Sequence, residues 1–195
     1  YELRGAGATN IAITGSTVSD LLLMASDGAT GISLAGSGIV TAANFGIALH
    51  DLTVTAGAGD ASVYNFGESA GSVTLIGGAG NNRLESMATS VGTLKLIGGT
   101  GSNRLLASRT RADSMILVGG AGSDDLDIEG GTVNSVSMTG GAGNDALRVA
   151  AEVLTSLLYD GGAGNNSIEL LGPLTAAGLT TSIVLGATGD NVAIL

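Results

Sequence analysis

A glycine-rich turn recurs along this chain at a constant interval of 21 residues. Self-similarity at a fixed period is the signature of a repeat architecture, in which each repeat packs on its neighbours. Beyond the regular series, the next equivalent glycine comes 25 residues later, so extra residues fall at 172–178, where Pro173 favours a loop. The last glycine of the turn falls at Gly59, Gly80, Gly101, Gly122, Gly143 and Gly164, with weaker copies at Gly38 and Gly189.

Between the turns, apolar side chains alternate with polar ones, which is typical of strands that bury one face. The apolar positions also keep the 21-residue step and therefore form columns. Before the turn these are Val73 and Leu75, Leu94 and Leu96, Met115 and Leu117, Val136 and Met138, and Leu157 and Tyr159. After the turn they are Leu84, Leu105, Leu126, Leu147 and Ile168, each followed two residues later by Ser86, Ala107, Ile128, Val149 or Leu170; a third column is Val91, Ala112, Val133 and Leu154.

Like residues stack on like residues in this pattern, whereas an antiparallel meander would pair different positions. The sequence therefore predicts an all-β fold, a right-handed parallel β-solenoid of about nine coils of 21 residues. We expect residues 1–195 to form a single repeat domain with a loop insertion near 172–178.

Composition narrows the class of protein further. Glycine occupies 34 of 195 positions with a single proline, which excludes collagen, and the 44% apolar content argues against a disordered linker. The net charge of −10 disfavours nucleic acid and anionic membranes as partners. Cysteine is absent, so disulfides and thiolate metal sites are excluded, and no apolar run is long enough for a membrane span.

The turns, such as the one from Gly119 to Leu126, resemble the RTX family and its nonapeptide Gly-Gly-x-Gly-x-Asp-x-(apolar)-x. The resemblance implies Ca²⁺ held between successive turns by backbone carbonyls and the Asp at the sixth position. Only Asp124 and Asp145 supply that Asp, and they are the candidate Ca²⁺ ligands. The alternative is a ladder of stacked amides that hydrogen-bond from coil to coil. The sixth position is Asn at Asn82, Asn103, Asn166 and Asn191, and Ala at Ala61.

Other motifs point to structure more than to chemistry. The segment from Gly67 to Gly71 matches Gly-x-Ser-x-Gly, but that motif needs a strand-to-helix turn and a histidine base, and the only histidine is His50. Arg83 and Arg104 are expected to form a surface ion-pair row with Glu85 and with acids on adjacent coils. The acidic group Asp124, Asp125, Asp127 and Glu129 is predicted to face solvent or a cation.

The chain enters the repeat pattern at once and stops on strand-like sequence, so we expect a piece of a longer chain or filament. The favoured function is a structural segment of a secreted or cell-surface protein, such as an adhesin, S-layer or matrix element, with no catalytic residues. Its expected partners are further copies stacked end to end or neighbouring domains of the same protein. The competing class is an accessory or catalytic β-helix of a secreted polysaccharide-modifying enzyme.

Overall fold

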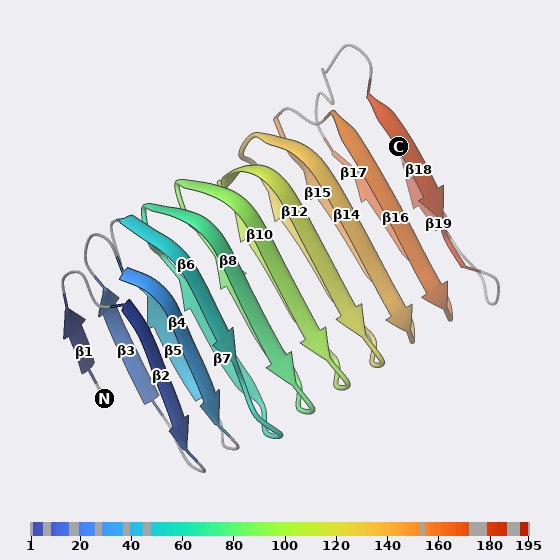
Figure 1. Ribbon diagram of the computed structural model, residues 1–195. Coiled ribbons are helices and arrows are strands. Elements are labelled where there is room, and N and C mark those ends of the chain that lie inside the picture. The colour runs from blue at the N-terminus through green and yellow to red at the C-terminus, as the bar shows by residue number, and fades with distance from the viewer. Residues whose placement is uncertain are drawn as a thin grey trace.

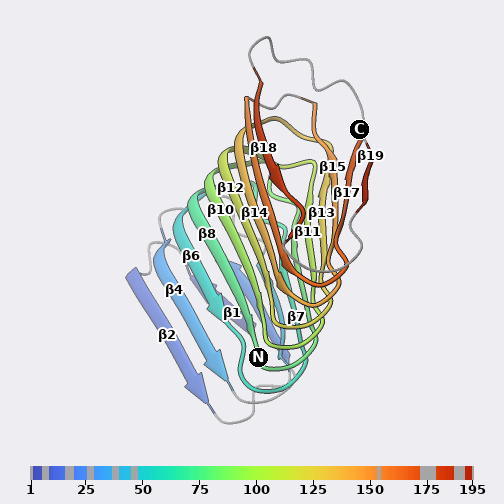
Figure 2. The same cartoon turned by 90° about the vertical axis from the view of Figure 1, so that its right-hand side faces the viewer.

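The chain winds into a parallel β-solenoid, described from a computed structural model. The described backbone comprises residues 2–5, 9–15, 20–25, 29–36, 40–44, 48–152, 155–171, 179–186 and 192–194, and side chains are described at 43, 50–152, 155–171 and 179–186. Successive strands alternate between two sheets that face each other, as the end-on view shows (Figure 2). Every pairing in both sheets is parallel, which confirms the sequence prediction over a meander.

The odd-numbered strands form one sheet, called sheet A here, and the even-numbered strands form the other, sheet B. In each sheet the strands lie in chain order from one end of the molecule to the other (Figure 1). Sheet A contains β1 (Glu2–Gly5), β3 (Asp20–Ala25), β5 (Val40–Asn44), β7 (Ala61–Asn65), β9 (Asn82–Ser86), β11 (Arg104–Ser108), β13 (Asp125–Glu129), β15 (Ala146–Ala150), β17 (Ser167–Leu170) and β19 (Val192–Ile194). Sheet B contains β2 (Thr9–Gly15), β4 (Ala29–Gly36), β6 (Ala48–Thr55), β8 (Ser69–Gly78), β10 (Ser90–Gly99), β12 (Arg111–Gly120), β14 (Val133–Ala142), β16 (Ser156–Ala163) and β18 (Thr180–Val184).

The register confirms the 21-residue coil. Leu94 of β10 pairs with Val73 of β8 on one side and with Met115 of β12 on the other. Near the C-terminal end Ser167 pairs with Val192, a step of 25 residues, so this step is four residues longer than the 21-residue coil. The inserted segment 172–178 itself lies outside the described residues.

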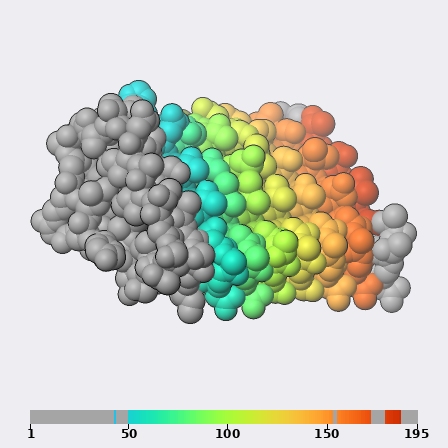
Figure 3. Space-filling view, turned by 60° about the horizontal axis from the view of Figure 1, so that its bottom comes forward, coloured from blue at the N-terminus to red at the C-terminus, as the bar shows by residue number. Residues whose placement is uncertain are grey.

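The expected number of coils was too high. About six turns are established, which matches the stretch of roughly six repeats from Ala48 to Leu171 where strands and nearly all connections are described. Both sheets continue beyond it, but the segments that join those outer strands lie outside the described residues. Nine was counted from glycine spacing alone, and the spacing becomes irregular toward both ends of the chain. In the space-filling view the coils of the described stretch form successive bands along the molecule (Figure 3).

The core lies between the two sheets, and most of its residues belong to the predicted columns. Leu94, Leu96 and Leu105 have exposed fractions of 0%, and so do their equivalents in neighbouring coils. The third column is buried at Val91, Ala112 and Val133, whereas its fourth predicted member, Leu154, lies outside the described residues. Burying each such side chain contributes on the order of 1.5–3 kcal/mol, so stacking of coils is the main source of stability. The described part of the chain contains only strands and connections, and within it no helix could cross a membrane.

Candidate functional site

The glycine-rich edge, where a sheet B strand turns into the next sheet A strand, allows the backbones of adjacent coils to approach closely. Gly99 has a φ of +119°, and a Cβ added to it would lie 1.8 Å from the carbonyl oxygen of Gly78. Gly120 and Gly141 repeat the arrangement one and two coils further on. Only glycine accepts both this φ and this distance. The turn therefore fixes a column of glycines, and it brings the following polar residues of successive coils into register.

Those polar residues form a buried ladder, which we call the inner ladder: Asn82, Asn103, Asp124, Asp145 and Asn166. In each rung a side-chain oxygen accepts the backbone N–H of the equivalent residue in the preceding coil. The N–O distances are 3.1 Å from Asn82 to Asn103, 2.7 Å from Asn103 to Asp124, 2.9 Å from Asp124 to Asp145 and 3.0 Å from Asp145 to Asn166. The coil-to-coil hydrogen-bond ladder expected from the sequence is confirmed.

The asparagines of the inner ladder also use their amide nitrogens. Asn82 Nδ2 donates to the carbonyl oxygens of Gly80, at 2.6 Å, and Gly98, at 3.1 Å, and Asn103 repeats both bonds with Gly101 and Gly119. Each asparagine thus bonds its own turn and the next one. An aspartate has an oxygen where this nitrogen would be.

The two aspartates leave that second oxygen without a partner. Asp124 and Asp145 have exposed fractions of 2% and 1%, and neither Oδ2 atom has a hydrogen-bond partner. Asp124 Oδ2 lies 2.4 Å from where a Cβ on Gly119 would stand, and the carbonyl oxygen of Gly140 lies 2.7 Å from the same point. The carboxylate oxygen and the carbonyl oxygen therefore both lie close to the same point, and both are hydrogen-bond acceptors.

Burial is the main cause of an altered acidity at these positions. Desolvation raises the pKa of Asp124 from 3.8 to about 6, opposed by hydrogen bonds from Asn103 and supported by the nearby charge of Asp145. Desolvation also raises the pKa of Asp145, opposed by the backbone N–H of Asp124. Both carboxyl groups thus favour the protonated form more than an exposed aspartate does.

A second, exposed ladder runs beside the inner one, and sequence reasoning missed it. Its members precede the inner ladder residues by one position, and at four steps a side-chain oxygen accepts the backbone N–H of the equivalent residue in the following coil. The signal was present in the sequence, because every residue of the column is small and carries a side-chain oxygen. The bonds run from Asn81 N to Asp60, from Ser102 N to Asn81, from Asn144 N to Ser123 and from Asn165 N to Asn144, at 2.7, 2.9, 3.2 and 2.8 Å.

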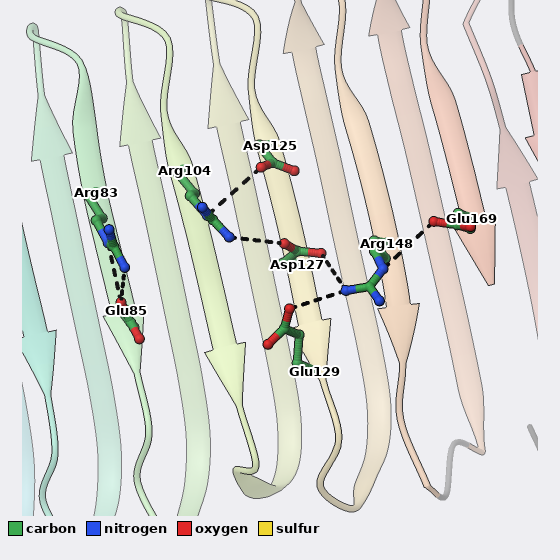
Figure 4. Close-up of polar contacts among 8 residues, drawn as sticks. All are labelled: Arg83, Glu85, Arg104, Asp125, Asp127, Glu129, Arg148 and Glu169. Atoms are coloured by element: carbon green, nitrogen blue, oxygen red, sulfur yellow. Dashed lines mark hydrogen bonds and ion pairs between the residues drawn. The ribbon is translucent and has the colours of Figure 1, made fainter. Parts of the chain in front are cut away.

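The outward face of sheet A carries the predicted row of ion pairs (Figure 4). Arg83 pairs with Glu85 at 2.9 Å, and Arg104 reaches Asp125 at 3.9 Å and Asp127 at 3.7 Å on the next coil. Arg148 extends the row to Glu129, at 3.1 Å, and also reaches Asp127 and Glu169. The expected row is confirmed, and Arg148 is a member that the sequence reasoning did not include.

Asp127 departs from expectation. We expected it to project into solvent with Asp125, but its exposed fraction is 6% while the Asp125 side chain is 51% exposed. Asp127 does point outward, yet the long side chains of Arg104 and Arg148 lie on either side of it (Figure 4). Desolvation raises its pKa, as do the charges of Asp125 and Glu129, while the two arginines lower it.

The serine motif lies in a setting unlike a nucleophile elbow. Ser69 begins β8 and continues directly into that strand, so the strand-to-helix turn that the motif requires is missing from these described residues. His50 is exposed in β6, and its neighbour Asp51 accepts a hydrogen bond from the Ser72 hydroxyl.

No group of three or more His, Cys, Asp or Glu side chains in the described part of the chain is arranged to hold a metal ion. Asp124 and Asp145 do lie on adjacent rungs, but as hydrogen-bond acceptors of the inner ladder. Comparison with protein-family models, curated proteins and solved structures gave no match.

Proposed function

We propose that this chain is a structural segment of an extracellular surface protein, acting as a stiff, extended element. The observation that carries the proposal is the inner ladder, which links every described coil from Asn82 to Asn166 without a break. Backbone pairing, a continuous core and two polar ladders all act along the same axis. Interactions of this kind resist bending and shear between coils, and they do not bring catalytic side chains together.

The extracellular part of the proposal rests on composition and on the glycine-rich turns. A net charge of −10 keeps an extended surface soluble, and the turn pattern is similar to that of the RTX family. End-to-end contact with further copies, or with neighbouring domains of the same protein, follows from the solenoid geometry, because each coil offers the next a complete set of strand edges.

Two measurements test this proposal. Small-angle X-ray scattering of the purified chain should give a rod whose maximum dimension does not change with ionic strength. Antibodies raised against the chain should label intact cells of the source organism as strongly as permeabilised cells. A maximum dimension that varies like that of a flexible chain, or labelling that appears only after permeabilisation, would contradict the proposal.

Ca²⁺ at Asp124 and Asp145 stays a prediction, and the residues present offer suitable donors. The two unpartnered Oδ2 atoms and the neighbouring glycine carbonyls are oxygen ligands, the type that Ca²⁺ takes. Bound at this edge, Ca²⁺ would supply positive charge between acceptors that otherwise repel. Asp124 and Asp145 would hold it, together with neighbouring carbonyl oxygens such as that of Gly140.

Thermal melting in CaCl₂ at pH 8 separates this prediction from the ladder alone. Ca²⁺ should raise the melting temperature of the wild-type chain, MgCl₂ should do so less, and the double variant D124N/D145N should not respond. A wild-type chain that ignores Ca²⁺, or a double variant that responds equally, would rule out the predicted site.

A further inference from the structure

A recess of about 790 Å³ opens at the edge opposite the glycine-rich turns, where sheet A strands lead into the next sheet B strands. Its size lies within the roughly 300–1,000 Å³ that small-molecule sites occupy. Its lining includes Met87, Arg109, Arg111, Glu129, Thr132 and Glu152.

The recess exists because one coil has glycines where its neighbours have side chains. In the 21-residue register, Gly130 and Gly131 stand beside Arg109 and Thr110 of the preceding coil. Gly131 has a φ of +82°, and a Cβ added to it would lie 2.2 Å from the Thr110 carbonyl oxygen. The pair therefore leaves a gap in the row of side chains, bordered by arginines on one side and by Glu152 on the other.

Arg109 is held in an uncommon backbone conformation at the edge of this gap. Its φ of +54° makes it the single non-glycine residue with a positive φ among the described residues, and its backbone N–H donates to the Glu129 carbonyl at 2.7 Å. Residues in this region persist where surrounding contacts fix them, which is more common at ligand sites than elsewhere. The conformation fixes the start of the Arg109 side chain beside Gly130, whose Cβ position is 3.8 Å from Arg109 Cγ.

The two arginines of the recess differ from those of the ion-pair row. Arg83, Arg104 and Arg148 all reach carboxylates (Figure 4). Arg109 and Arg111 make no ion pair with any residue that the structure describes. Of the two acids in the recess, Glu129 already bonds Arg148 at 3.1 Å.

This leaves two unpaired guanidinium groups and one carboxylate, that of Glu152, in a recess on a strongly acidic protein. Guanidinium groups bind carboxylates through paired N–H donors. Thr132 and Glu152 can bond hydroxyl groups, and Met87, with an exposed fraction of 42%, offers an apolar surface.

From these features we propose that the recess binds an acidic sugar, with Arg109 and Arg111 on the carboxylate and Thr132 and Glu152 on the hydroxyls. This site is independent of the structural role proposed above. It is also separate from the inner ladder, which lies at the opposite edge of the coils.

Titration of the isotope-labelled chain followed by NMR tests the proposal, with D-glucuronate, D-glucose and sodium sulfate as probes at constant ionic strength. Glucuronate should produce saturable shifts of the Gly130 and Gly131 amides and of the Arg109 and Arg111 side-chain N–H signals. Glucose and sulfate should bind at least about tenfold more weakly, because each lacks one half of the recognition.

The matched variants are Arg109→Asn, Arg111→Gln and Lys95→Gln. Asparagine tolerates the left-handed backbone of Arg109 and removes its guanidinium group. Lys95 lies within β10 of sheet B and does not line the recess, so its variant controls for net charge. Each arginine variant should weaken glucuronate binding roughly tenfold, and Lys95→Gln should leave it unchanged. Three results would each overturn the proposal. Sulfate binding as tightly as glucuronate would show a site for any anion, and glucose binding as tightly would show that the arginines do not bind the ligand. The absence of saturable shifts would show that the recess does not bind glucuronate.

Discussion

At the scale of single residues, the inner ladder depends on one atom per rung. Asn103 and Asp124 accept the same backbone hydrogen bond with Oδ1, but Asn103 adds a donor toward Gly119 where Asp124 has Oδ2. A buried acceptor without a hydrogen-bond partner destabilises the fold by more than an ordinary hydrogen bond stabilises it, because the loss of its hydration is not compensated. The chain thus contains its own comparison of amide and carboxyl at equivalent positions.

The first prediction concerns Asp124→Asn. The folded pKa of Asp124 is raised to about 6, above the usual unfolded value, so its contribution to stability is fully present near pH 4 and is lost as pH rises through 6. In EDTA at pH 8 the variant should be more stable than wild type by about 3 kcal/mol, and the gain should shrink toward pH 4. Urea unfolding at both pH values measures this.

The control for that experiment is Asp125→Asn, one residue further on. The Asp125 side chain is 51% exposed and its nearest cation, Arg104, is 3.9 Å away, so removing its charge should change stability by less than about 1 kcal/mol at either pH. A D124N variant that loses stability at pH 8 would show that the ionised carboxylate is favoured in the ladder.

The second prediction contrasts two glycines with positive φ. A Cβ at Gly99 would lie 1.8 Å from the Gly78 carbonyl oxygen at a φ of +119°, whereas at Gly130 the nearest atom is 3.8 Å away at a φ of +67°. Gly99→Ala should therefore lower the free energy of unfolding by about 3 kcal/mol or more, and Gly130→Ala by about 1 kcal/mol. Denaturant titration of the two variants distinguishes them, and equal losses would contradict the close approach of the coils at Gly99.

At the scale of the strand, each element is buried by its neighbours in both directions and by the facing sheet. The third prediction compares the inward and outward faces of sheet B. Leu96 of β10 points into the core with an exposed fraction of 0%, and Leu158 of β16 points outward at 48%. Leu96→Ala should cost about 3 kcal/mol, while Leu158→Ala should change stability by less than about 0.5 kcal/mol. Similar effects on the melting curve would mean that β10 does not bury its predicted face.

The same scale shows what could be predicted from the sequence. The inward columns, the parallel register and the inner ladder were all predictable, because each depends on residue type at a fixed step, as at Leu94 and Asn103. The burial of Asp127 was not, since it depends on how Arg104 and Arg148 bend over it from adjacent coils. The recess was not predicted, because the 21-residue columns were searched for recurring side chains. The recess arises instead where Gly130 and Gly131 have no side chain.

At the scale of the whole molecule, each described coil contacts mainly its two neighbours, so stability is close to a sum of coil and interface contributions. Between Ala48 and Leu171 the register repeats without a bulge, which makes the coils there interchangeable to a first approximation. The length of a deletion should therefore matter more than its position.

The fourth prediction is that deleting the 21 residues from Thr93 to Asp113 leaves a folded solenoid. The deletion joins Gly92 to Ser114, the register partner of Thr93, so Leu126 would stack on Leu84 and Asn82 could bond Asp124 in place of Asn103. Circular dichroism should retain a β spectrum with a cooperative transition at a lower temperature, because one coil and its interface are lost. Deleting only the ten residues from Thr93 to Ser102 is the matched control, since it would join a sheet B strand to a sheet A strand without a turn and should unfold the chain. Folding of the shorter deletion, or unfolding of the longer one, would show that coils are not exchangeable units.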